Sequence, residues 1–527
     1  MIAGLSFRAD GSVNGVPYPL PVRVGALTGW RRSIVLILLG ALAALALPPV
    51  GFVPILLVSI PGLIWAWDGA HSVKSAFLTG WWWTLGFYSA GFYWLANALL
   101  IDADSFGWMV PFATIGMSGL NAAFPAAGFA AAYRIASRGP ARIVWIAIFW
   151  TIAEWLRTFV LTGFPWNPIG SVWDQVLPIL QVGSVFGVHG LSFMTILSFG
   201  LLACALAPGR NRRILALIAV GIPLVLGVWG QTRLLISPTT FVPGVKLRMV
   251  QPVAPLMTKW RPENREPALQ DLVALSRGDG FTEVTHVIWP ESAAPFDLMN
   301  DPVHRNLAAA AAPPDGLVLA GAPHFKPKGD GTWAYWNSLI AIDTQGQVQG
   351  FYDKAHLVPF GEYVPLRWLL PIPHAVAAMG DFSAGPGPRT LTLTGLPPVG
   401  PAICYESVFP GQVVVKGNDR PKWMVIITND GWFGDSAGPY QHFAAARMRA
   451  VEEGLPVARA ANTGISGVID AYGRTVVRLG LGTRGIVDSF LPDSSRSMTI
   501  YGQWGDWSVV LLLVLSALIA VALERYN

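Results

Sequence analysis

The feature that most constrains this chain is a long stretch without charge. No charged side chain occurs from Ser33 to Trp67, and Pro48-Pro49 divides that stretch into two apolar pieces. A membrane-spanning helix needs about 20 apolar residues. Further apolar segments of similar length lie at 75–101, 108–132, 143–162, 181–207, 214–232 and 507–523. The sequence therefore predicts eight transmembrane helices, seven within residues 33–232 and one at 507–523.

The composition agrees with a membrane protein. Charged residues make up only 13% of the chain, whereas soluble proteins contain about 25%. The net charge of +5 comes from basic residues that are spaced between apolar segments and do not gather in one patch. Membrane topology explains such spacing better than binding to nucleic acid does.

The loops between the expected spans predict an orientation. Every second loop is basic, and the basic residues at these positions are Arg31, Arg32, Lys74, Arg134, Arg138, Arg142, Arg210, Arg212, Arg213 and Arg525. The loop after the third span carries Asp102 and Asp104 instead. Because basic loops stay in the cytoplasm, both termini are expected there and residues 233–506 outside. Residues 1–32 lack the apolar core of a signal peptide and are expected to form a cytoplasmic tail.

Residues 245–495 differ from the rest of the chain. They contain short apolar runs rich in β-forming residues at 246–252, 285–290, 316–325, 337–353 and 422–430, together with a helical stretch from Tyr440 to Gly454. These runs do not alternate cleanly between apolar and polar residues, which favours strands that are buried on both faces. The segment is therefore predicted to be one α/β domain of ordinary size.

The chain has two cysteines, and only one of them lies in a polar region. Cys204 sits in an apolar run, where it is expected to be a small membrane-facing residue. Cys404 sits in PAICYESVFP, so a disulfide between the two is not expected. The spacing of cysteine and histidine does not match a metal site, and the chemistry below requires no cofactor.

Three short patterns place reactive residues at the ends of apolar runs. Glu291 lies in VIWPESAAP, Lys354 and Glu362 lie in YDKAHLVPFGEYVP, and Cys404 follows the run PAI. A cysteine attacks as its thiolate and therefore needs a base or a cationic neighbour. A glutamate can take the proton, and a fixed lysine can stabilise the oxyanion that forms. These three residue types suffice for acyl transfer through a thioester.

In this order and with these flanking sequences, Glu291, Lys354 and Cys404 resemble the nitrilase (carbon–nitrogen hydrolase) superfamily. The longer strings FGEYVP, TNDGWFGDSAGPYQH at 428–442 and ANTGISGVID at 461–470 resemble its membrane branch, the apolipoprotein N-acyltransferases. The segment 154–170 is similar to the TGFPW loop of that family. The resemblance implies a membrane helical bundle joined to an extracytoplasmic αββα sandwich.

The resemblance also implies an activity and the roles of residues. An acyl chain passes from a membrane phospholipid to Cys404, and then to the α-amine of a diacylglyceryl-modified apolipoprotein, at a bacterial inner membrane. Glu291 corresponds to the general base, Lys354 to the oxyanion stabiliser and Cys404 to the nucleophile. Glu362, Tyr405 and Glu406 correspond to supporting residues.

Aromatic residues near these motifs are candidates for substrate contact or for lids. Trp260, in MTKW, aligns loosely with a substrate-contacting tryptophan of the family. The segments Leu366–Leu370, which contains Trp368, and Trp432–Phe433 are expected to dip into lipid, because aromatic side chains favour the membrane interface.

Several of these residues also have plain structural interpretations. Taken alone, Glu291 is a solvated strand-end carboxylate, Lys354 a surface lysine and Cys404 a buried small side chain; Glu362 either pairs with Lys354 or acts directly. We interpret His356 and His442 as packing or hydrogen-bonding residues. Glu154 and Arg157, three apart in one expected span, are interpreted as an intramembrane pair that holds helices together, with substrate contact as the alternative.

Two other functions share parts of this pattern. A membrane-tethered amidase would use the same three residues but would not require seven preceding spans or the TGFPW segment. A transporter or scaffold with an inactive domain would belong to a different class of protein. The expected spans contain few ionisable residues beyond Glu154, Arg157 and His189, and all three reactive positions are occupied, which favours an enzyme.

Overall fold

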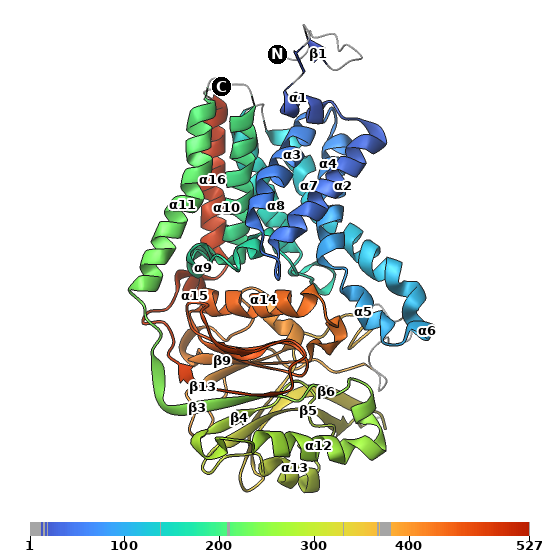
Figure 1. Cartoon of the computed structure of the whole chain (residues 1–527), viewed down its shortest axis with the longest axis vertical. Coiled ribbons are helices and arrows are strands. Elements are labelled where there is room, and N and C mark those ends of the chain that lie inside the picture. The colour runs from blue at the N-terminus through green and yellow to red at the C-terminus, as the bar shows by residue number, and fades with distance from the viewer. Residues whose placement is uncertain are drawn as a thin grey trace.

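The computed structural model divides the chain into a helical part and an α/β part that are stacked end to end (Figure 1). It describes residues 12–13, 16–17, 19–136, 139–207, 211–329, 331–365, 368 and 381–525. The α/β part is inserted between the last two long helices of the helical part. Figure 1 shows α1 (Leu20–Gly25) and the end of α16 (Trp507–Arg525) at the same end of the molecule, farthest from the sheets.

Each apolar segment expected to span the membrane contains a helix. The main helices are α2 (Gly29–Ala43), α3 (Leu56–Asp68), α4 (Val73–Gly91), α7 (Met117–Ile135), α8 (Ala141–Leu156), α10 (Gly183–Leu206), α11 (Arg212–Leu235) and α16. Shorter ones are α5 (Leu95–Leu100), α6 (Ala103–Phe106), α9 (Leu177–Leu180) and α15 (Ile500–Trp504), and β1 (Ser12–Val13) pairs with β2 (Val16–Pro17) near the N-terminus.

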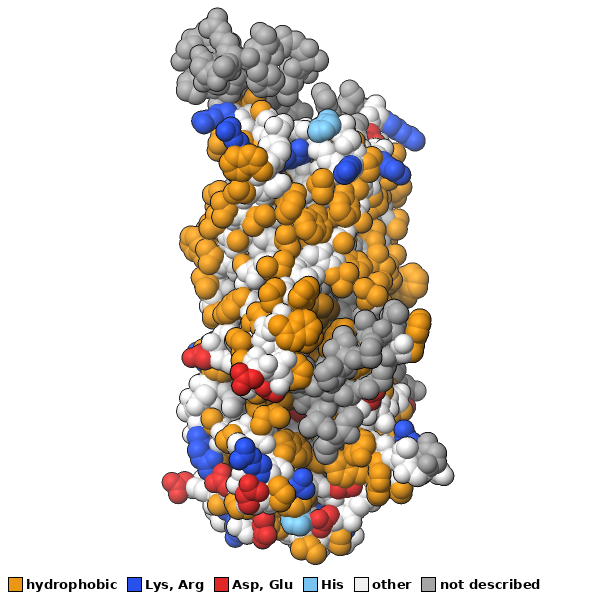
Figure 2. Space-filling view, turned by 90° about the vertical axis from the view of Figure 1, so that its right-hand side faces the viewer, with side chains coloured by type: hydrophobic (Ala, Val, Ile, Leu, Met, Phe, Trp, Pro, Cys, Tyr) orange, Lys and Arg blue, Asp and Glu red, His pale blue; other side chains and the backbone are white. Residues whose placement is uncertain are grey.

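Within the described residues, four helices are long and apolar enough to cross a membrane. They are Gly29–Ala46, Gly183–Leu206, Arg212–Leu235 and Trp507–Arg525. Figure 2 shows a broad hydrophobic band across one face of the helical part, with Lys and Arg side chains beyond it at the end away from the sheets. These observations establish membrane-type helices, while the count of eight spans stays a prediction.

One expected span, 75–101, is not a single helix, which corrects its predicted extent. It divides into α4 and α5 because the Gly91 carbonyl is bonded by side chains instead of by the next helical turn. Trp94 Nε1 donates to it at 3.1 Å and Asn167 Nδ2 at 3.2 Å. The chain therefore turns at residues 92–94, and α5 leads towards the α/β part.

Small residues let α2 and α4 pack closely. A Cβ at Gly40 would lie 1.8 Å from the Trp83 carbonyl oxygen, and one at Gly86 would lie 2.1 Å from the Ile37 carbonyl oxygen. Only glycine permits this close approach of two backbones. In a membrane, where lipid provides no hydrophobic driving force between helices, such close approach stabilises their association through van der Waals packing.

The α/β part contains two sheets. The six-stranded sheet has the order β13-β3-β4-β5-β6-β7, and the five-stranded sheet has the order β12-β11-β10-β9-β8. The strands are β3 (Phe241–Gln251), β4 (His286–Ile288), β5 (Leu317–Pro327), β6 (Trp333–Asp343), β7 (Val348–Asp353), β8 (Val399–Ile403), β9 (Trp423–Thr428), β10 (Val457–Ala461), β11 (Ser466–Ile469), β12 (Thr475–Leu479) and β13 (Gly485–Pro492). The helices are α12 (Pro262–Ser276), α13 (Pro302–Ala309) and α14 (Ala437–Glu453).

The buried side chains arrange these elements in four layers, which confirms the expected αββα sandwich. One core, including Met249, Leu319 and Val425, fills the space between the two sheets. A second core joins the outer face of the six-stranded sheet to α12 and α13, and a third joins the five-stranded sheet to α14. The strands of the central layers are buried on both faces, as their unbroken apolar runs predict. In Figure 1, α14 lies between the sandwich and the helical part.

Candidate active site

Cys404 occupies a sharp turn at the end of a central strand. It follows β8 directly, begins the short 3-10 helix Cys404–Val408, and is 6% exposed. Its φ of +54° lies in the left-handed region, which is costly for a residue with a Cβ and occurs at sites where the surrounding structure enforces it. The turn lifts the thiol out of the sheet towards the other sheet's strand ends.

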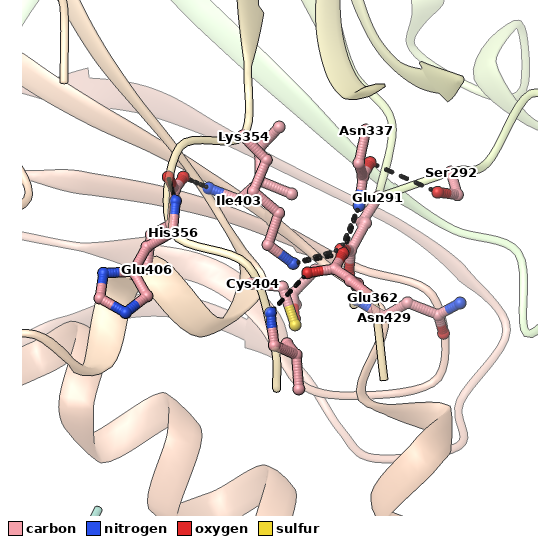
Figure 3. A network of polar contacts seen from close by, with 12 residues as sticks. Glu291, Ser292, Asn337, Lys354, His356, Glu362, Ile403, Cys404, Glu406 and Asn429 are labelled. Carbon is pink, nitrogen blue, oxygen red and sulfur yellow. Dashed lines mark hydrogen bonds and ion pairs between the residues drawn. The ribbon is translucent and has the colours of Figure 1, made fainter. Parts of the chain in front are cut away.

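Glu291, Lys354 and Glu362 gather around this thiol (Figure 3). Glu291 comes just after β4 and Lys354 just after β7, so both belong to the six-stranded sheet, whereas Cys404 comes from the five-stranded one. Lys354 Nζ lies 3.2 Å from Glu291 Oε1 and 2.8 Å from Glu362 Oε1. Figure 3 shows the Cys404 sulfur close to this ammonium and these carboxylates. The fold thus brings together the residues that three separate motifs predicted.

Two amide groups hold Glu291 in place. Asn337 Nδ2 donates to Glu291 Oε1 at 2.7 Å, and the backbone N–H of Asn429 donates to Oε2 at 2.8 Å. The same Asn337 Nδ2 also donates to Glu362 Oε1 at 3.3 Å, and Glu362 Oε2 accepts from the Val358 N–H at 2.8 Å. The two carboxylates are therefore fixed before any substrate binds, as preorganised catalysis requires.

The electrostatics of the cluster keep charge on the lysine and off the thiol. Burial alone would lower the pKa of Lys354, but the carboxylates of Glu291 and Glu362 raise that pKa well above its ordinary value. Burial and the Glu291 carboxylate raise the pKa of the Cys404 thiol, against the opposing effect of Lys354. The resting thiol is protonated, so its attack requires transfer of the proton to a neighbouring base.

Glu406 ties the two sheets together beside the nucleophile. Its carboxylate accepts hydrogen bonds from Ile403 N at 2.7 Å, Tyr352 OH at 2.7 Å, Ala355 N at 2.8 Å and His356 N at 3.0 Å. These donors flank Lys354 on one side and Cys404 on the other. Glu406 therefore fixes the positions of Lys354 and Cys404 without lining either of the two cavities described below.

The helical part contributes to the same site. Tyr405 OH donates to the Gly163 carbonyl at 2.8 Å, and His356 Nε2 lies 3.0 Å from the Thr162 carbonyl. Gln441 Oε1 accepts from three N–H groups of the helical part: Trp94 Nε1 at 3.0 Å, Trp166 Nε1 at 3.0 Å and Asn167 Nδ2 at 3.1 Å. The segment containing TGFPW is thus a docking surface for the α/β part.

A second, sealed charged network lies beneath Cys404. His442 Nε2 lies 3.0 Å from the Cys404 carbonyl, and His442 Nδ1 lies 2.8 Å from Asp430 Oδ1. Arg459 Nη2 pairs with Asp430 Oδ2 at 2.8 Å. Burial would raise the pKa of Asp430, but Arg459 and His442 hold it well below its usual range. His442 thus acts as a hydrogen-bonding residue, as the sequence analysis interpreted it.

An apolar cavity of about 310 Å³ leads from the nucleophile into the helical part. Glu291, Lys354 and Cys404 line it together with other residues of the α/β part, such as Phe360 and Tyr405. Most of its other walls are apolar side chains of the helical part, among them Leu95, Leu99, Met117, Leu120, Phe124 and Phe164, next to the polar Asn121 and Arg157. This shape suits a long hydrocarbon group whose reactive end meets the thiol.

A second cavity, of about 350 Å³, lies on the other side of the carboxylates. It shares Glu291, Gly361, Glu362 and Trp432 with the first cavity, and its other walls include Lys259, Trp260 and Arg265. Trp260 and Trp432 are therefore placed where substrate contact is possible.

The other two aromatic candidates lie in different surroundings. Phe433 packs against the rings of Trp94 and Trp166 at 4.5 and 5.5 Å, in the contact between the two halves of the molecule, and also lines the first cavity. Trp368 is 82% exposed. The remainder of the expected lid Leu366–Leu370 lies outside the residues that the structure describes.

The sequence interpretation of Glu154 and Arg157 needs correction. The two do not form an ion pair in the described structure. Glu154 Oε1 accepts from Trp150 Nε1 and from the Ile169 N–H. Arg157 bonds to Asn121 and Tyr88, on two other helices, and to two loop carbonyls. The reason is that side chains from neighbouring helices reach the guanidinium more favourably than a residue one turn away.

Sequence reasoning also missed several residues of the site. Asn337, Asn429 and Gln441 hold or dock the reactive cluster; all three lie in runs or strings that the sequence singled out, but none was predicted to have this role. Lys259 and Arg265 line the second cavity without any local signal. Among the described residues, no group of three or more His, Cys, Asp or Glu side chains could hold a metal ion.

The fold and this cluster define a class, that of the carbon–nitrogen hydrolases. Residues 247–495 match the Carbon-nitrogen hydrolase model, and residues 39–202 match the model of the Apolipoprotein N-acyltransferase N-terminal domain. An apolipoprotein N-acyltransferase of Rhodopseudomonas palustris is 39% identical over 94% of this chain and 96% of its own length. One of Bradyrhizobium diazoefficiens is 40% identical over 94% of this chain and 95% of its own length. The chain belongs to the apolipoprotein N-acyltransferase family.

Proposed function

We propose that this protein transfers an acyl chain from a membrane phospholipid to the α-amine of the N-terminal diacylglyceryl-cysteine of an apolipoprotein. The observation that carries the proposal is the position of Cys404. It lines an apolar cavity whose other walls come largely from the helical part, with a carboxylate and an ammonium beside it. A hydrolase of small soluble amides would not need such a cavity.

In the first step Cys404 Sγ attacks the ester carbonyl while Glu291 takes the thiol proton. Lys354 stabilises the oxyanion of the tetrahedral intermediate. The C–O bond then breaks, the lysophospholipid leaves with the proton from Glu291, and the acyl group remains on Cys404 as a thioester.

In the second step the neutral α-amine of the apolipoprotein attacks the thioester. Glu291 takes a proton from the nitrogen and returns it to the departing sulfur, which completes the amide and regenerates the thiol. The two substrates use one site in turn, so the mechanism is ping-pong. Glu362 anchors Lys354, and Glu406 and Tyr405 hold the turn that carries the nucleophile. No metal or organic cofactor takes part.

We also propose how the chain crosses the membrane. Eight spans cross a bacterial inner membrane, both termini face the cytoplasm, and the domain at 245–495 faces the periplasm. The hydrophobic band and the basic end away from the sheets support this orientation. Trp260 and Trp432 contact substrate, and Trp368 is an exposed aromatic that meets the lipid surface.

The test is covalent trapping of the acyl group. Purified protein in detergent is incubated with a phospholipid labelled in its acyl chains, next to the Cys404→Ala variant. Label that stays on the wild type, that hydroxylamine removes and that the variant lacks supports the thioester, and transfer of that label to an apolipoprotein amine supports the second step. Folded wild type that takes no label from any phospholipid contradicts the proposal.

A further inference from the structure

Lys259 differs from the other buried basic residues of the α/β part. In the part of the chain that the structure describes, each of the others has a carboxylate oxygen within 3 Å: Arg248 with Asp488 at 2.7 Å, Lys354 with Glu362 at 2.8 Å, Arg449 with Glu452 at 2.9 Å and Arg459 with Asp430 at 2.8 Å. Lys259 is only 3% exposed, yet among the described residues it forms no ion pair within 4 Å. Buried charges are normally paired, because desolvating a charge is costly.

Among the described residues, the nearest partners of the Lys259 ammonium are a neutral acceptor and an aromatic ring. Its Nζ donates to the Ser292 carbonyl at 2.6 Å, and the Trp260 ring lies 5.3 Å from the same nitrogen. Burial lowers the pKa of Lys259 to about 8, even though Glu291 acts to raise it. The ammonium therefore sits next to a neutral acceptor and an aromatic ring, with room for an anion in the adjoining cavity.

A second cation lines the same cavity. Arg265 is partly buried, and within the described residues its one hydrogen bond joins Nε to the Trp260 carbonyl at 2.9 Å. The cavity walls also include two carboxylates, Glu291 and Glu362, but both are engaged by Lys354. The cavity thus offers two cations to a ligand, and with Lys354 beside it three cations face two carboxylates.

The position of this cavity identifies the ligand. It meets the apolar cavity at Glu291, Glu362 and Trp432, beside the nucleophile. In a glycerophospholipid no more than three carbons separate the reactive ester from the phosphate. An ester held at the junction, with its acyl chain in the apolar cavity, places the phosphate among these cations. Arg and Lys are the usual protein partners of phosphate oxygens.

We propose that Lys259 and Arg265 form a phosphate-binding subsite for the headgroup of the acyl donor. The assignment rests on the proposed function, since it takes the donor to be a glycerophospholipid. It makes the phosphodiester a specificity determinant: the site distinguishes a phospholipid from a neutral glyceride that carries the same acyl chains.

The decisive measurement compares two acyl donors that differ only in the phosphate. The rate of thioester formation is measured with phosphatidylglycerol and with diacylglycerol of the same acyl composition in mixed micelles. We expect Lys259→Met to lower kcat/KM for phosphatidylglycerol about 10- to 100-fold and to leave the value for diacylglycerol within about twofold. Lys259→Arg should restore most of the preference. Arg261→Met is the matched control, because Arg261 lies in the same segment, is exposed and does not line the cavity.

The competing explanation is that Lys259 only holds Ser292, which has a φ of +49°, and so positions Glu291. In that case both donors lose rate equally, and the proposal is overturned. It is also overturned if Lys259→Met changes neither rate. If Lys259→Met changes neither rate but abolishes inhibition by millimolar inorganic phosphate, the site binds free phosphate and not a lipid headgroup.

A binding measurement separates this proposal from the proposed function. Diether phosphatidylglycerol has no ester to cleave, so its affinity for the Cys404→Ala variant does not depend on acyl transfer. We expect Lys259→Met in that background to weaken binding of this lipid at least tenfold and to leave binding of the matching dialkylglycerol unchanged. If the wild type forms no thioester but this difference persists, the function is wrong and the phosphate subsite stands. If the difference is absent, the subsite is wrong.

Discussion

Two buried charged clusters flank Cys404, and they differ in what they leave open. Glu291, Lys354 and Glu362 line the cavities above the thiol, whereas Asp430, His442 and Arg459 lie below it and line neither cavity. Both clusters contain carboxylate–cation contacts of 2.8 Å. In the lower cluster the interactions end on the backbone of the nucleophile, at the Cys404 carbonyl. The comparison teaches that burial and pairing do not distinguish the two clusters, whereas access to a cavity does.

The two clusters also differ in which part of the molecule supports them. The upper cluster is held by residues of the α/β part, such as Asn337 and Asn429. The lower one is reached from the helical part, because Trp166 packs on His442 with a centroid distance of 5.3 Å and bonds to the neighbouring Gln441. The helical part therefore acts as a second support for the nucleophile in addition to forming the apolar cavity.

The largest expected effect comes from breaking the upper cluster. Cys404→Ala and Glu291→Gln should each lower thioester formation by about 10⁴-fold or more, because each removes a group that acts on the reacting atoms. Acyl label on the protein measures the loss. The melting temperature should stay close to that of the wild type. If Glu291→Gln retained more than a tenth of the rate, Glu291 would not be the base.

Breaking the lower cluster should mainly destabilise the protein. Asp430→Asn leaves Arg459 buried without its counter-charge, a change that costs about 3–5 kcal/mol and lowers the melting temperature of a domain of this size by roughly 6–20 °C. Thermal unfolding in detergent measures the shift. Asp271→Asn is the control, since the Asp271–Arg484 pair is 48% exposed on both sides and should contribute about 1 kcal/mol or less. Equal melting of the two variants would refute the distinction.

Much of the upper cluster was accessible from the sequence. Glu291, Lys354 and Cys404 each follow an apolar run, and strand ends at one edge of a sandwich converge by geometry. The strands at 246–252, 285–290, 316–325 and 422–430 correspond to β3, β4, β5 and β9. The run at 337–353 is in fact two strands, β6 and β7, joined by a turn at Thr344–Gly346.

The lower cluster was not predictable in the same way. His442, Asp430 and Arg459 come from a helix, a turn and a strand whose spacing follows no short periodicity, so only tertiary packing brings them together. The same holds for Lys259, whose distinction is the absence of a carboxylate partner, a property of the folded chain. The pairing expected for Glu154 and Arg157 was wrong for a related reason: helical spacing allows a pair, but side chains on neighbouring helices decide it.

A smaller effect should follow from loosening the contact between the two parts of the molecule. Gln441→Ala removes one oxygen that accepts from three buried N–H groups, and an unpaired buried donor costs about 1–3 kcal/mol. We expect a melting temperature lower by a few degrees and a reduced kcat for thioester formation with little change in KM, because Trp166 supports His442 beneath the nucleophile. Gln441→Glu retains an acceptor and should recover most of both losses. Gln349→Ala, at an exposed position, is the control. An unchanged kcat in Gln441→Ala would show that this contact joins the two parts of the molecule without affecting the position of Cys404.

The last expected effect, absent below pH 7, is a pH dependence that sharpens the contrast between paired and unpaired cations. Burial lowers the pKa of Lys259 to about 8, so its ammonium is present below that pH and is lost as pH rises. The carboxylates beside Lys354 raise its pKa, and that ammonium persists. The kcat/KM for a phospholipid should therefore fall about tenfold per pH unit above pH 8 relative to that for diacylglycerol, whereas the ratio stays constant below pH 7. Lys259→Arg keeps its charge and should flatten the ratio up to pH 10. A ratio that falls equally in this variant would trace the pH dependence to another group and leave Lys259 without a role in headgroup recognition.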